Sequence, residues 1–453
     1  MCIVGGGMSG LAVAQHLRLR SAADVMIIEA GKADRSAVHI GEQYEAETAA
    51  RQWLDPTRDP FAWRAWSTTD PRHYGKDSVL RRRLGGRSLY WGGVTIPIEP
   101  WALVDWPETV RRELAVGWDA GPSLYERTNR ALSKWAPAIA PLHQNQMLTL
   151  GQTHLSAVPR AVRPLPGGRW TAYSPLSAVA EEAQVTIMGG AEVLRVEVRG
   201  RGKLRVHIRS GQGLFDTYDC HAVCLAAGTL ENSRLAAELL SVAELPRLND
   251  HLVQGLLIPL RRRRLVSARP GVLYWLPGNA DQRWNTFAKV RADQGHIPLL
   301  GIWTMGEQLP SWASVVRVTP ATVEVTPGLC EQDHRLLDAQ RRWLTEVARE
   351  VDRDLDDIDF GDFLAADRPV LRALAAARAG LPAAITRPLG TVDYEAGTLP
   401  LGSVLTEDGE VGEGTSIFVT GPATFPRSGA ANPSLTTLAL AQRTAHAMAE
   451  RVA

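Results

Sequence analysis

The stretch from Cys2 to Gly31 constrains the fold more than any other part of the chain. It reads CIVGGGMSGLAVAQHLRLRSAADVMIIEAG, and Gly5, Gly7 and Gly10 have the G-x-G-x-x-G spacing directly after a short apolar run. In such a sequence a parallel strand passes through a tight turn into a helix whose amino end faces a pyrophosphate. A second apolar run ends at Glu29, which is placed to accept hydrogen bonds from a ribose. The stretch therefore predicts a strand–helix–strand unit that binds a dinucleotide.

The three glycines do different things in such a turn. The first makes the turn, the second lets backbone amides approach a diphosphate, and the third lets the helix lie close on the sheet. The motif alone does not separate FAD from NAD, but its place at the amino end, with a small Ala-Gly pair after the acid, is typical of FAD sites. The first strand starts almost at Met1, which is short for a central strand and leaves open a start a few residues upstream. From this unit we expect cofactor contacts by Gly5, Gly7, Met8, Ser9, Gly10, Glu29 and Ala30.

Length and charge limit the classes of protein to which the chain can belong. With 453 residues it is too long for one compact core and suits two connected domains. A formal net charge of +1 gives no basic excess for binding nucleic acid. No apolar run approaches the length that spans a bilayer, and the first apolar segment is the nucleotide-binding strand rather than a cleavable signal. The basic runs Arg81 to Arg83 and Arg261 to Arg264 could each be a solvated strand or loop edge, and this interpretation is favoured for the second.

The cysteines indicate a reducing compartment. There are four, at positions 2, 220, 224 and 330, which is too few for a disulfide framework. Cys220 and Cys224 lie in a strand-like run without a cluster of histidines or further cysteines, so packing is favoured over metal binding. We therefore expect a cytoplasmic protein without a metal site.

A second glycine-rich stretch runs from Leu84 to Pro97 and reads LGGRSLYWGGVTIP. Its two glycine pairs bracket a serine, a tyrosine and a tryptophan, a composition that allows the backbone to run against a flat ligand. The alternative is a glycine-rich surface loop, but such a loop does not normally carry a Tyr-Trp pair between its glycines. From this stretch we expect cofactor contacts by Gly86, Arg87, Ser88, Trp91, Gly92 and Gly93.

In these motifs the sequence resembles the glucose-methanol-choline (GMC) oxidoreductases, in which an amino-terminal FAD fingerprint is followed by a GGxSxxxxG segment against the flavin. Further matching segments follow in the family's order: Trp106-Pro107, SLYE from 123 to 126, GAEVLRVEV around Val193, VCLAAGTLENSRL from 223 to 235, LNDH from 248 to 251, and FVTGPATFPRSGAANPSLTTLALA from 418 to 441. The resemblance implies that Val193 meets the adenine. It also implies cofactor contacts by Ala227, Gly228, Asn432 and Pro433.

The predicted fold class is α/β, with a Rossmann-type FAD-binding domain and a second, largely antiparallel-sheet substrate domain, as in the GMC architecture. We place the first domain at 1–250, with a cofactor-covering excursion at about 40–80, the second at 251–390, and a return to the first at 391–453. Alternating apolar runs predict strands in the middle region at Leu256 to Leu260, Val272 to Leu276, Leu299 to Met305 and Ser314 to Val318, and Asp333 to Val351 is an amphipathic helix.

Four aromatic side chains of this middle region are candidates for lining an apolar substrate pocket, with plain core packing as the alternative for each. They are Tyr274, Trp275, Trp303 and Trp312.

The proton-transfer site departs from the family. There, a histidine in an H-x-x-G-T segment removes the hydroxyl proton while a hydride passes to the flavin. The matching stretch is YEAGT, so Tyr394 stands in the histidine's position, whereas the partner position keeps Asn432. A tyrosine has an unperturbed pKa of about 10, which makes it a poor resting base but a good hydrogen-bond donor. Glu395 is the nearest carboxylate that could serve as base, unless it is a surface or helix-start residue.

The two main candidates also have structural interpretations: Tyr394 as a buried tyrosine with its hydroxyl satisfied, and Asn432 as a cap for the closing helix. Two other departures concern the cofactor. Gly421 occupies the aspartate position of the family's V-x-D, which removes one contact to the flavin side chain, worth about 1–3 kcal/mol. Tyr90 matches the histidine through which some members attach FAD, so we expect non-covalent FAD.

The sequence thus supports two functions from different classes. The first is an FAD-dependent GMC-like oxidoreductase that acts on a large, apolar small molecule of secondary metabolism. The alternative is an FAD-containing cyclase or isomerase in which the flavin is structural and Tyr394 polarises a carbonyl. A third possibility, an inactive cofactor-binding subunit, is disfavoured because the sheet region is complete in length.

Overall fold

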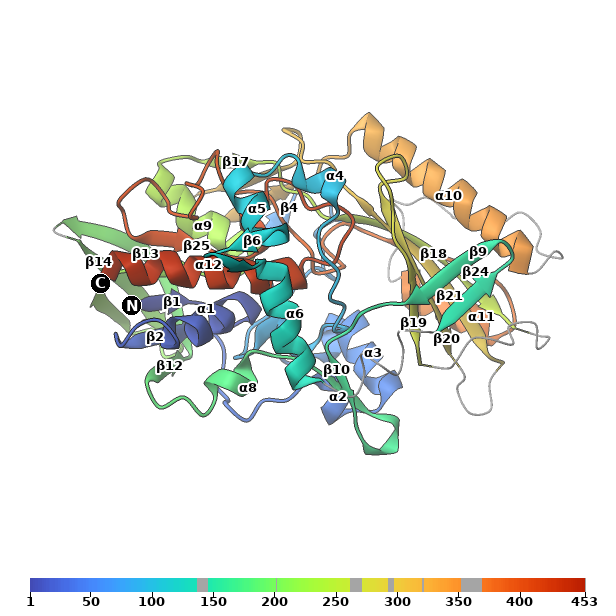
Figure 1. Cartoon of the computed structure of the whole chain (residues 1–453), viewed down its shortest axis with the longest axis horizontal. Helices are drawn as coiled ribbons and strands as arrows, with labels where there is room; N and C mark the ends of the chain where they lie inside the picture. Colours follow the sequence, from blue (N-terminus) through green and yellow to red (C-terminus); the bar gives the residue numbers. More distant parts are fainter. Residues whose placement is uncertain are drawn as a thin grey trace.

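The computed structural model describes residues 1–136, 146–200, 202–260, 271–291, 297–319, 322–351 and 369–452. Figure 1 shows two lobes side by side. One lobe contains both chain ends and the glycine-rich turn, and the other is built around a large antiparallel sheet crossed by a long helix. The α/β fold class predicted from the sequence is confirmed.

The first lobe is organised by a five-stranded sheet in the order β12-β2-β1-β16-β25. All its pairings are parallel. The strands β1 (Cys2–Val4), β16 (Val223–Leu225) and β25 (Ile417–Val419) are buried along their whole length, as expected of strands covered on both faces. The other two strands are β2 (Val25–Glu29) and β12 (Val185–Gly189), and β12 and β25 are the two edges of the sheet. Residues from both ends and the middle of the chain therefore form one sheet.

Helices cover this sheet in the way its sequence pattern requires. α1 (Met8–Arg18) follows β1 directly and packs against the closing helix α12 (Ser434–Val452). α9 (Thr229–Leu240) follows β16, so the predicted strand-to-helix turn after 225 is confirmed. α6 (Leu124–Trp135) begins with a capping box, in which the Ser123 hydroxyl and the Glu126 carboxylate each accept from the other's backbone N–H.

The second lobe is a seven-stranded antiparallel sheet in the order β24-β18-β21-β20-β19-β9-β8. Its strands are β24 (Ala383–Arg387), β18 (His251–Pro259), β21 (Leu299–Glu307), β20 (Trp284–Arg291), β19 (Leu273–Leu276), β9 (Thr153–Ala157) and β8 (Met147–Leu150). The predicted amphipathic helix is α10 (Glu331–Val351), which lies across β18 and β21. α11 (Pro369–Arg378) packs beside β24.

Smaller sheets accompany the two large ones. The predicted strand at Ser314 to Val318 exists as β22 (Val315–Val318), but it pairs with β17 (Glu244–Pro246) and β23 (Val323–Thr326), and β23 pairs with β4 (Trp66–Thr68). It therefore does not belong to the large sheet. The first lobe carries an antiparallel ribbon of β13 (Ala191–Gly200), β14 (Lys203–Ser210) and β15 (Phe215–Cys220).

The short elements lie mostly in the region of the predicted excursion and in the connections. They are α2 (Ile40–Gln43), α3 (Ala46–Leu54), β3 (Ala62–Trp63), β5 (Leu80–Arg81), α4 (Pro100–Leu103), α5 (Glu108–Ala115), β6 (Gly117–Trp118), β7 (Gly121–Pro122), β10 (Val162–Pro164), β11 (Trp170–Ala172) and α8 (Leu176–Val179). The domain limits given above stay a prediction. The basic run 261–264 falls outside the described residues. Among the described helices, none has the length and apolarity needed to cross a bilayer.

Candidate active site

A cavity of about 770 Å³ is lined by residues of both lobes. Its wall contains the glycine turn after β1, parts of the stretch 80–92, the inner faces of β20 and β21, and the segments 385–395 and 432–437. The volume lies within the range of roughly 300–1,000 Å³ found for cofactor and ligand sites. Its lining includes almost every cofactor and catalytic residue that the sequence predicts: Gly5, Gly7, Met8, Ser9, Glu29, Ala30, Gly86, Arg87, Trp91, Gly92, Val193, Ala227, Gly228, Tyr394, Glu395, Asn432 and Pro433.

The glycine turn has the shape that a diphosphate requires. A Cβ atom added at Gly7 would meet no protein atom within 4 Å, and Gly7 borders the cavity at the amino end of α1. A Cβ atom added at Gly10 would instead lie 2.0 Å from the Gly5 carbonyl oxygen. Gly10 is not part of the cavity lining. The missing side chain at Gly10 allows α1 to approach β1. The missing side chain at Gly7 instead leaves the backbone N–H groups and the positive end of the helix dipole accessible to an anion.

Glu29 ends β2 beside this turn. Its Oε2 accepts from Gly6 N at 2.9 Å and its Oε1 accepts from Gly31 N at 2.7 Å. Burial raises the pKa of this carboxyl, against the two backbone hydrogen bonds that lower it. A carboxylate accepts at more sites than two, so the oxygens can still take hydrogen bonds from ribose hydroxyls. The cradle and this acceptor fit the adenosine diphosphate part of FAD.

The second glycine-rich stretch lines the cavity only in part. Gly86, Arg87, Trp91 and Gly92 border it. Two other residues with predicted contacts, Ser88 and Gly93, do not line the cavity, and their contacts stay a prediction. The Ser88 hydroxyl is completely buried and donates to the Gly85 carbonyl. Gly93 backs onto Val162, which lies 2.5 Å from the position of an added Cβ.

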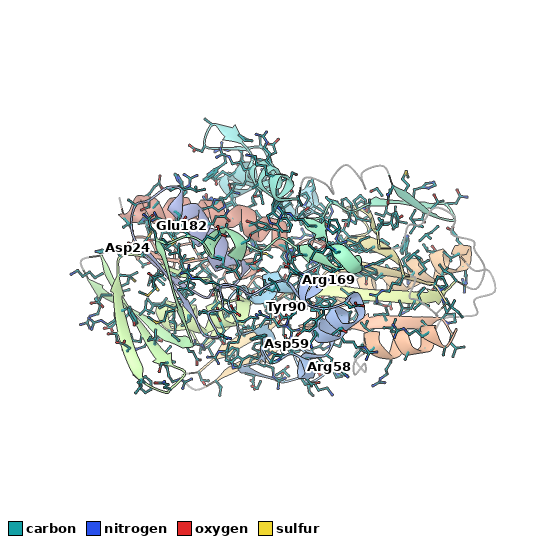
Figure 2. The ribbon with its side chains drawn as sticks, turned by 90° about the horizontal axis from the view of Figure 1, so that it is seen from below. Asp24, Arg58, Asp59, Tyr90, Arg169 and Glu182 are labelled. Carbon is teal, nitrogen blue, oxygen red and sulfur yellow. The ribbon has the colours of Figure 1, made fainter. Side chains whose placement is uncertain are left out.

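Tyr90, which occupies the position of covalent attachment in some GMC members, lines the cavity. The Arg81 guanidinium lies 4.7 Å from the centre of its ring, and Arg81 pairs with the buried Asp59 at 2.6 Å. Figure 2 shows Tyr90 and Asp59 near each other toward the middle of the molecule. Burial raises the pKa of Tyr90 to about 12, so the ring is a neutral wall residue. Sequence reasoning did not assign Arg81 to the site.

The two residues expected at the proton-transfer site meet on the cavity wall. The Asn432 side-chain nitrogen donates to the Tyr394 hydroxyl oxygen. Burial raises the pKa of Tyr394 to about 12, although the bond from Asn432 lowers it. The tyrosine is therefore protonated near neutral pH, and since its oxygen already accepts from Asn432, its own O–H can donate to a ligand. Asn432 Oδ1 has no partner in the described part of the chain, which leaves an acceptor at the same place.

His251 lies beside this pair, a neighbour that sequence reasoning did not find. It begins β18, and its ring meets the Tyr394 ring edge-on at 5.2 Å. Burial lowers its pKa to about 4, so the imidazole is neutral near pH 7. The LNDH segment that precedes the strand was recognised as a family match, but only the fold brings its histidine to Tyr394.

Glu395 does not have the environment of a free base. It is 3% exposed, and its two oxygens accept from the Arg87 nitrogens at 2.5 and 2.9 Å. Arg87 also lies 3.2 Å from Asp393. The sequence interpretation of Glu395 as a replacement base is therefore unfavourable, because taking up a proton would break a buried bidentate ion pair. The pair ties the second glycine-rich stretch to the segment that carries Tyr394.

Gly421 has φ of +89°, and an added Cβ would lie 2.7 Å from the Ser9 hydroxyl oxygen. A residue with a side chain would be strained in this conformation. The departure from the family at this position therefore involves the backbone as well as the lost carboxylate.

The four aromatic residues predicted as possible pocket-lining residues lie in different environments. Trp303 lines the cavity and is joined there by Phe287, whose ring stacks on it at 5.8 Å. Tyr274 is fully buried in a separate core cluster, and Trp312 is 77% exposed, so the pocket-lining interpretation was wrong for both. Trp275 donates to Asn285 Oδ1 at 3.1 Å and does not line the cavity.

The described residues contain no cluster of His, Cys, Asp or Glu suited to a metal ion.

Glu99 supports the loop that leads to Asn432. Its oxygens accept from Asn285 Nδ2 at 2.7 Å and from Ala430 N at 3.0 Å. Burial raises its pKa from 4.5 to about 7. A raised pKa in the folded state contributes stability that is full below about 4.5 and is lost as the pH rises through about 7.

We therefore expect the stability advantage of the wild type over Glu99→Gln to shrink by about 3 kcal/mol between pH 4.5 and 7.5. Glutamine keeps the shape but does not titrate. Urea unfolding of both proteins at several pH values measures the difference. Unfolding curves that stay equally far apart at every pH would show that the Glu99 pKa is not raised.

Comparisons with known proteins agree with this geometry. A family model described as an NAD(P)-binding Rossmann-like domain matches residues 3–67. The comparison with curated proteins found no match. Among solved structures, the chain is similar to pyridoxine 4-oxidase from Mesorbium loti, with a TM-score of 0.61, 16% identity and 98% of each chain covered.

The chain is also similar to a formate oxidase, with a TM-score of 0.62, 14% identity, and 99% of this chain and 97% of that chain covered. A formate oxidase from Aspergillus oryzae RIB40, studied for the effect of a mutation on FAD modification, gives a TM-score of 0.63 and 13% identity with the same coverage. At these identities the likeness establishes the fold. The two-part architecture implied by the resemblance is confirmed over the whole length of the chain.

Proposed function

We propose that this chain is an FAD-dependent oxidoreductase of the GMC type that acts on a large, mostly apolar small molecule. The observation that carries the proposal is the hydrogen-bonded Tyr394–Asn432 pair on the wall of the same cavity that the Gly7 cradle opens into. The full-length likeness to two oxidases supports it. When bound, FAD supplies the hydride acceptor, which protein side chains cannot replace.

The protein's own residues would bind and orient the two reactants. Gly7, Glu29 and Val193 line the part of the cavity that suits the adenosine diphosphate. Phe287, Trp303 and Met305, from the strands of the second lobe, give the cavity an apolar surface that suits an apolar substrate. Tyr394 holds its proton near neutral pH and donates to a substrate oxygen, while Asn432 fixes the position of the phenol.

A second candidate is favoured by the protonation of Tyr394. A protonated phenol cannot take up a hydroxyl proton, and burial makes the imidazole of His251 a weak base by lowering its pKa to about 4. The phenol can instead polarise a carbonyl. This supports a cyclase or isomerase of secondary metabolism in which the flavin is structural.

One experiment separates the two functions. The purified protein is mixed anaerobically with candidate substrates while the flavin absorbance and the products are followed. Bleaching of the flavin, or turnover that requires an oxidant, is the result expected of the oxidoreductase. Product formed at a constant flavin oxidation state would contradict the oxidoreductase and support the cyclase or isomerase. A colourless protein that cannot be reconstituted with FAD would contradict both functions.

We further propose that the cofactor is bound without a covalent link, because Tyr90 stands where some family members have a histidine. The other contacts of Tyr90, with Arg81 and Asp59, support a wall position for the ring. Acid precipitation of the holoprotein should release all the yellow colour into the supernatant. Colour that stays in the pellet would contradict this proposal.

A further inference from the structure

Arg387 is a half-buried cation in the cavity wall, and it has no ion pair in the described part of the chain. It is the last residue of β24, opposite Val253 of β18, and both residues line the cavity. Burial lowers the pKa of its guanidinium. Keeping an arginine charge partly out of water without a directly bonded carboxylate costs free energy, which a bound anion would offset.

The guanidinium is held in a fixed plane. Nε donates to Thr391 Oγ1 at 3.2 Å, and Nη2 donates to the Thr391 carbonyl oxygen. The guanidinium carbon lies 5.4 Å from the centre of the Trp53 ring. These contacts occupy the Nε–Nη2 side. The end formed by Nη1 and the second N–H of Nη2 has no partner among the described residues, and two parallel N–H groups of this kind match a carboxylate.

The charges of Asp393, Asp250 and Asp77 act on Arg387 and oppose the lowering of its pKa by burial. Asp250 accepts from His251 N at 2.7 Å and from Gly390 N at 2.6 Å. Asp393 places Oδ1 at 3.2 Å from Arg87, and its Oδ2 accepts from Trp53 Nε1 at 3.1 Å. Both oxygens of Glu395 are taken by Arg87. The carboxylates of Asp393 and Glu395 therefore neutralise Arg87, and Arg387 lines the cavity without an ion pair among the described residues.

We propose that Arg387 binds a carboxylate of the substrate, so that the substrate is an apolar molecule that carries a carboxylate group. Arg387 and Tyr394 belong to one short segment and line one cavity, so a carboxylate held by the first orients the rest of the molecule past the second. The apolar part then meets Phe287, Trp303 and Met305. This inference deepens the proposed function and rests on it for the position of the reaction.

Binding to the purified holoprotein tests the inference by calorimetry, with the flavin content determined separately. The probes are hexanoate, decanoate and cinnamate, each compared with its methyl ester. We expect at least one carboxylate to bind about 10- to 100-fold more tightly than its ester, and Arg387→Met to abolish that preference while leaving ester binding unchanged. Arg387→Lys, which keeps the positive charge but lacks the two parallel N–H groups of the guanidinium, should retain part of the preference. Arg291 is another cation that lines the cavity. As a control, Arg291→Met should leave the preference for carboxylate over ester within about threefold of the wild type.

Two outcomes would overturn the inference. One is that no carboxylate binds more tightly than its ester to a protein that contains its FAD. The other is that Arg387→Met loses FAD and keeps the carboxylate preference, which would make Arg387 a cofactor residue. A preparation that cannot be loaded with FAD but still prefers carboxylates through Arg387 would refute the proposed function and not this inference.

Discussion

Replacing Tyr394 by phenylalanine should lower turnover by about 10²- to 10⁴-fold while the protein keeps its FAD. The substitution removes one oxygen from a ring that stays packed against His251, so the fold is preserved. What is lost is the hydroxyl that Asn432 holds, and with it a proton that the phenol retains up to a pKa of about 12. Single-turnover kinetics of both proteins with one substrate measures the effect, with flavin content as the control for folding.

The pH dependence adds a second test of the same residue. If Tyr394 acts as a donor, activity should persist through neutral pH and fall only toward the pKa of about 12. Asn432→Asp should be harmful in a different way, because a carboxylate cannot donate to the phenol and would compete for its proton. Normal rates in Tyr394→Phe would remove Tyr394 from the chemistry, whichever of the two functions is correct.

The parts of the fold that depend on local sequence could be predicted. Three such parts are the glycine turn, the strand-to-helix passage after 225 and the helix over 331–351. Each is determined by residues close together in the sequence, through their spacing, apolar periodicity and capping. The partner of a strand, in contrast, cannot be predicted from the residues near it in the sequence. The run at 315–318 has the same alternation as the strands of the large sheet, but it pairs with 244–246 and 323–326, because pairing depends on where the chain returns.

The site shows the same division between local and distant information. Tyr394 and Asn432 could be found because each lies in a recognisable segment, and the fold brings the two together. The role of Glu395 could not, since its partner Arg87 is 308 positions away. Arg387 was missed for a similar reason: an arginine at the end of a strand looks like a solvated edge until the structure shows which acids are already engaged.

Two alanine substitutions in the opening turn should separate cofactor binding from folding. Gly7→Ala places a methyl group in open space within the cavity, at a residue whose φ of −84° alanine tolerates. We expect the free energy of unfolding without cofactor to change by less than about 0.5 kcal/mol. FAD affinity should fall by about 100-fold, since the methyl group keeps the diphosphate away from backbone donors worth about 1.5–3 kcal/mol each.

Gly10→Ala, three residues further along and within the first turn of α1, should do the opposite. Its methyl group would lie 2.0 Å from the Gly5 carbonyl oxygen, and neither backbone can yield without moving α1 off β1. We expect a loss of about 3 kcal/mol of stability, seen by urea unfolding of the apoprotein, whereas FAD titration of both variants gives the affinities. Equal losses of FAD affinity and stability in the two variants would show that Gly7 serves only packing, and that the diphosphate does not lie at this turn.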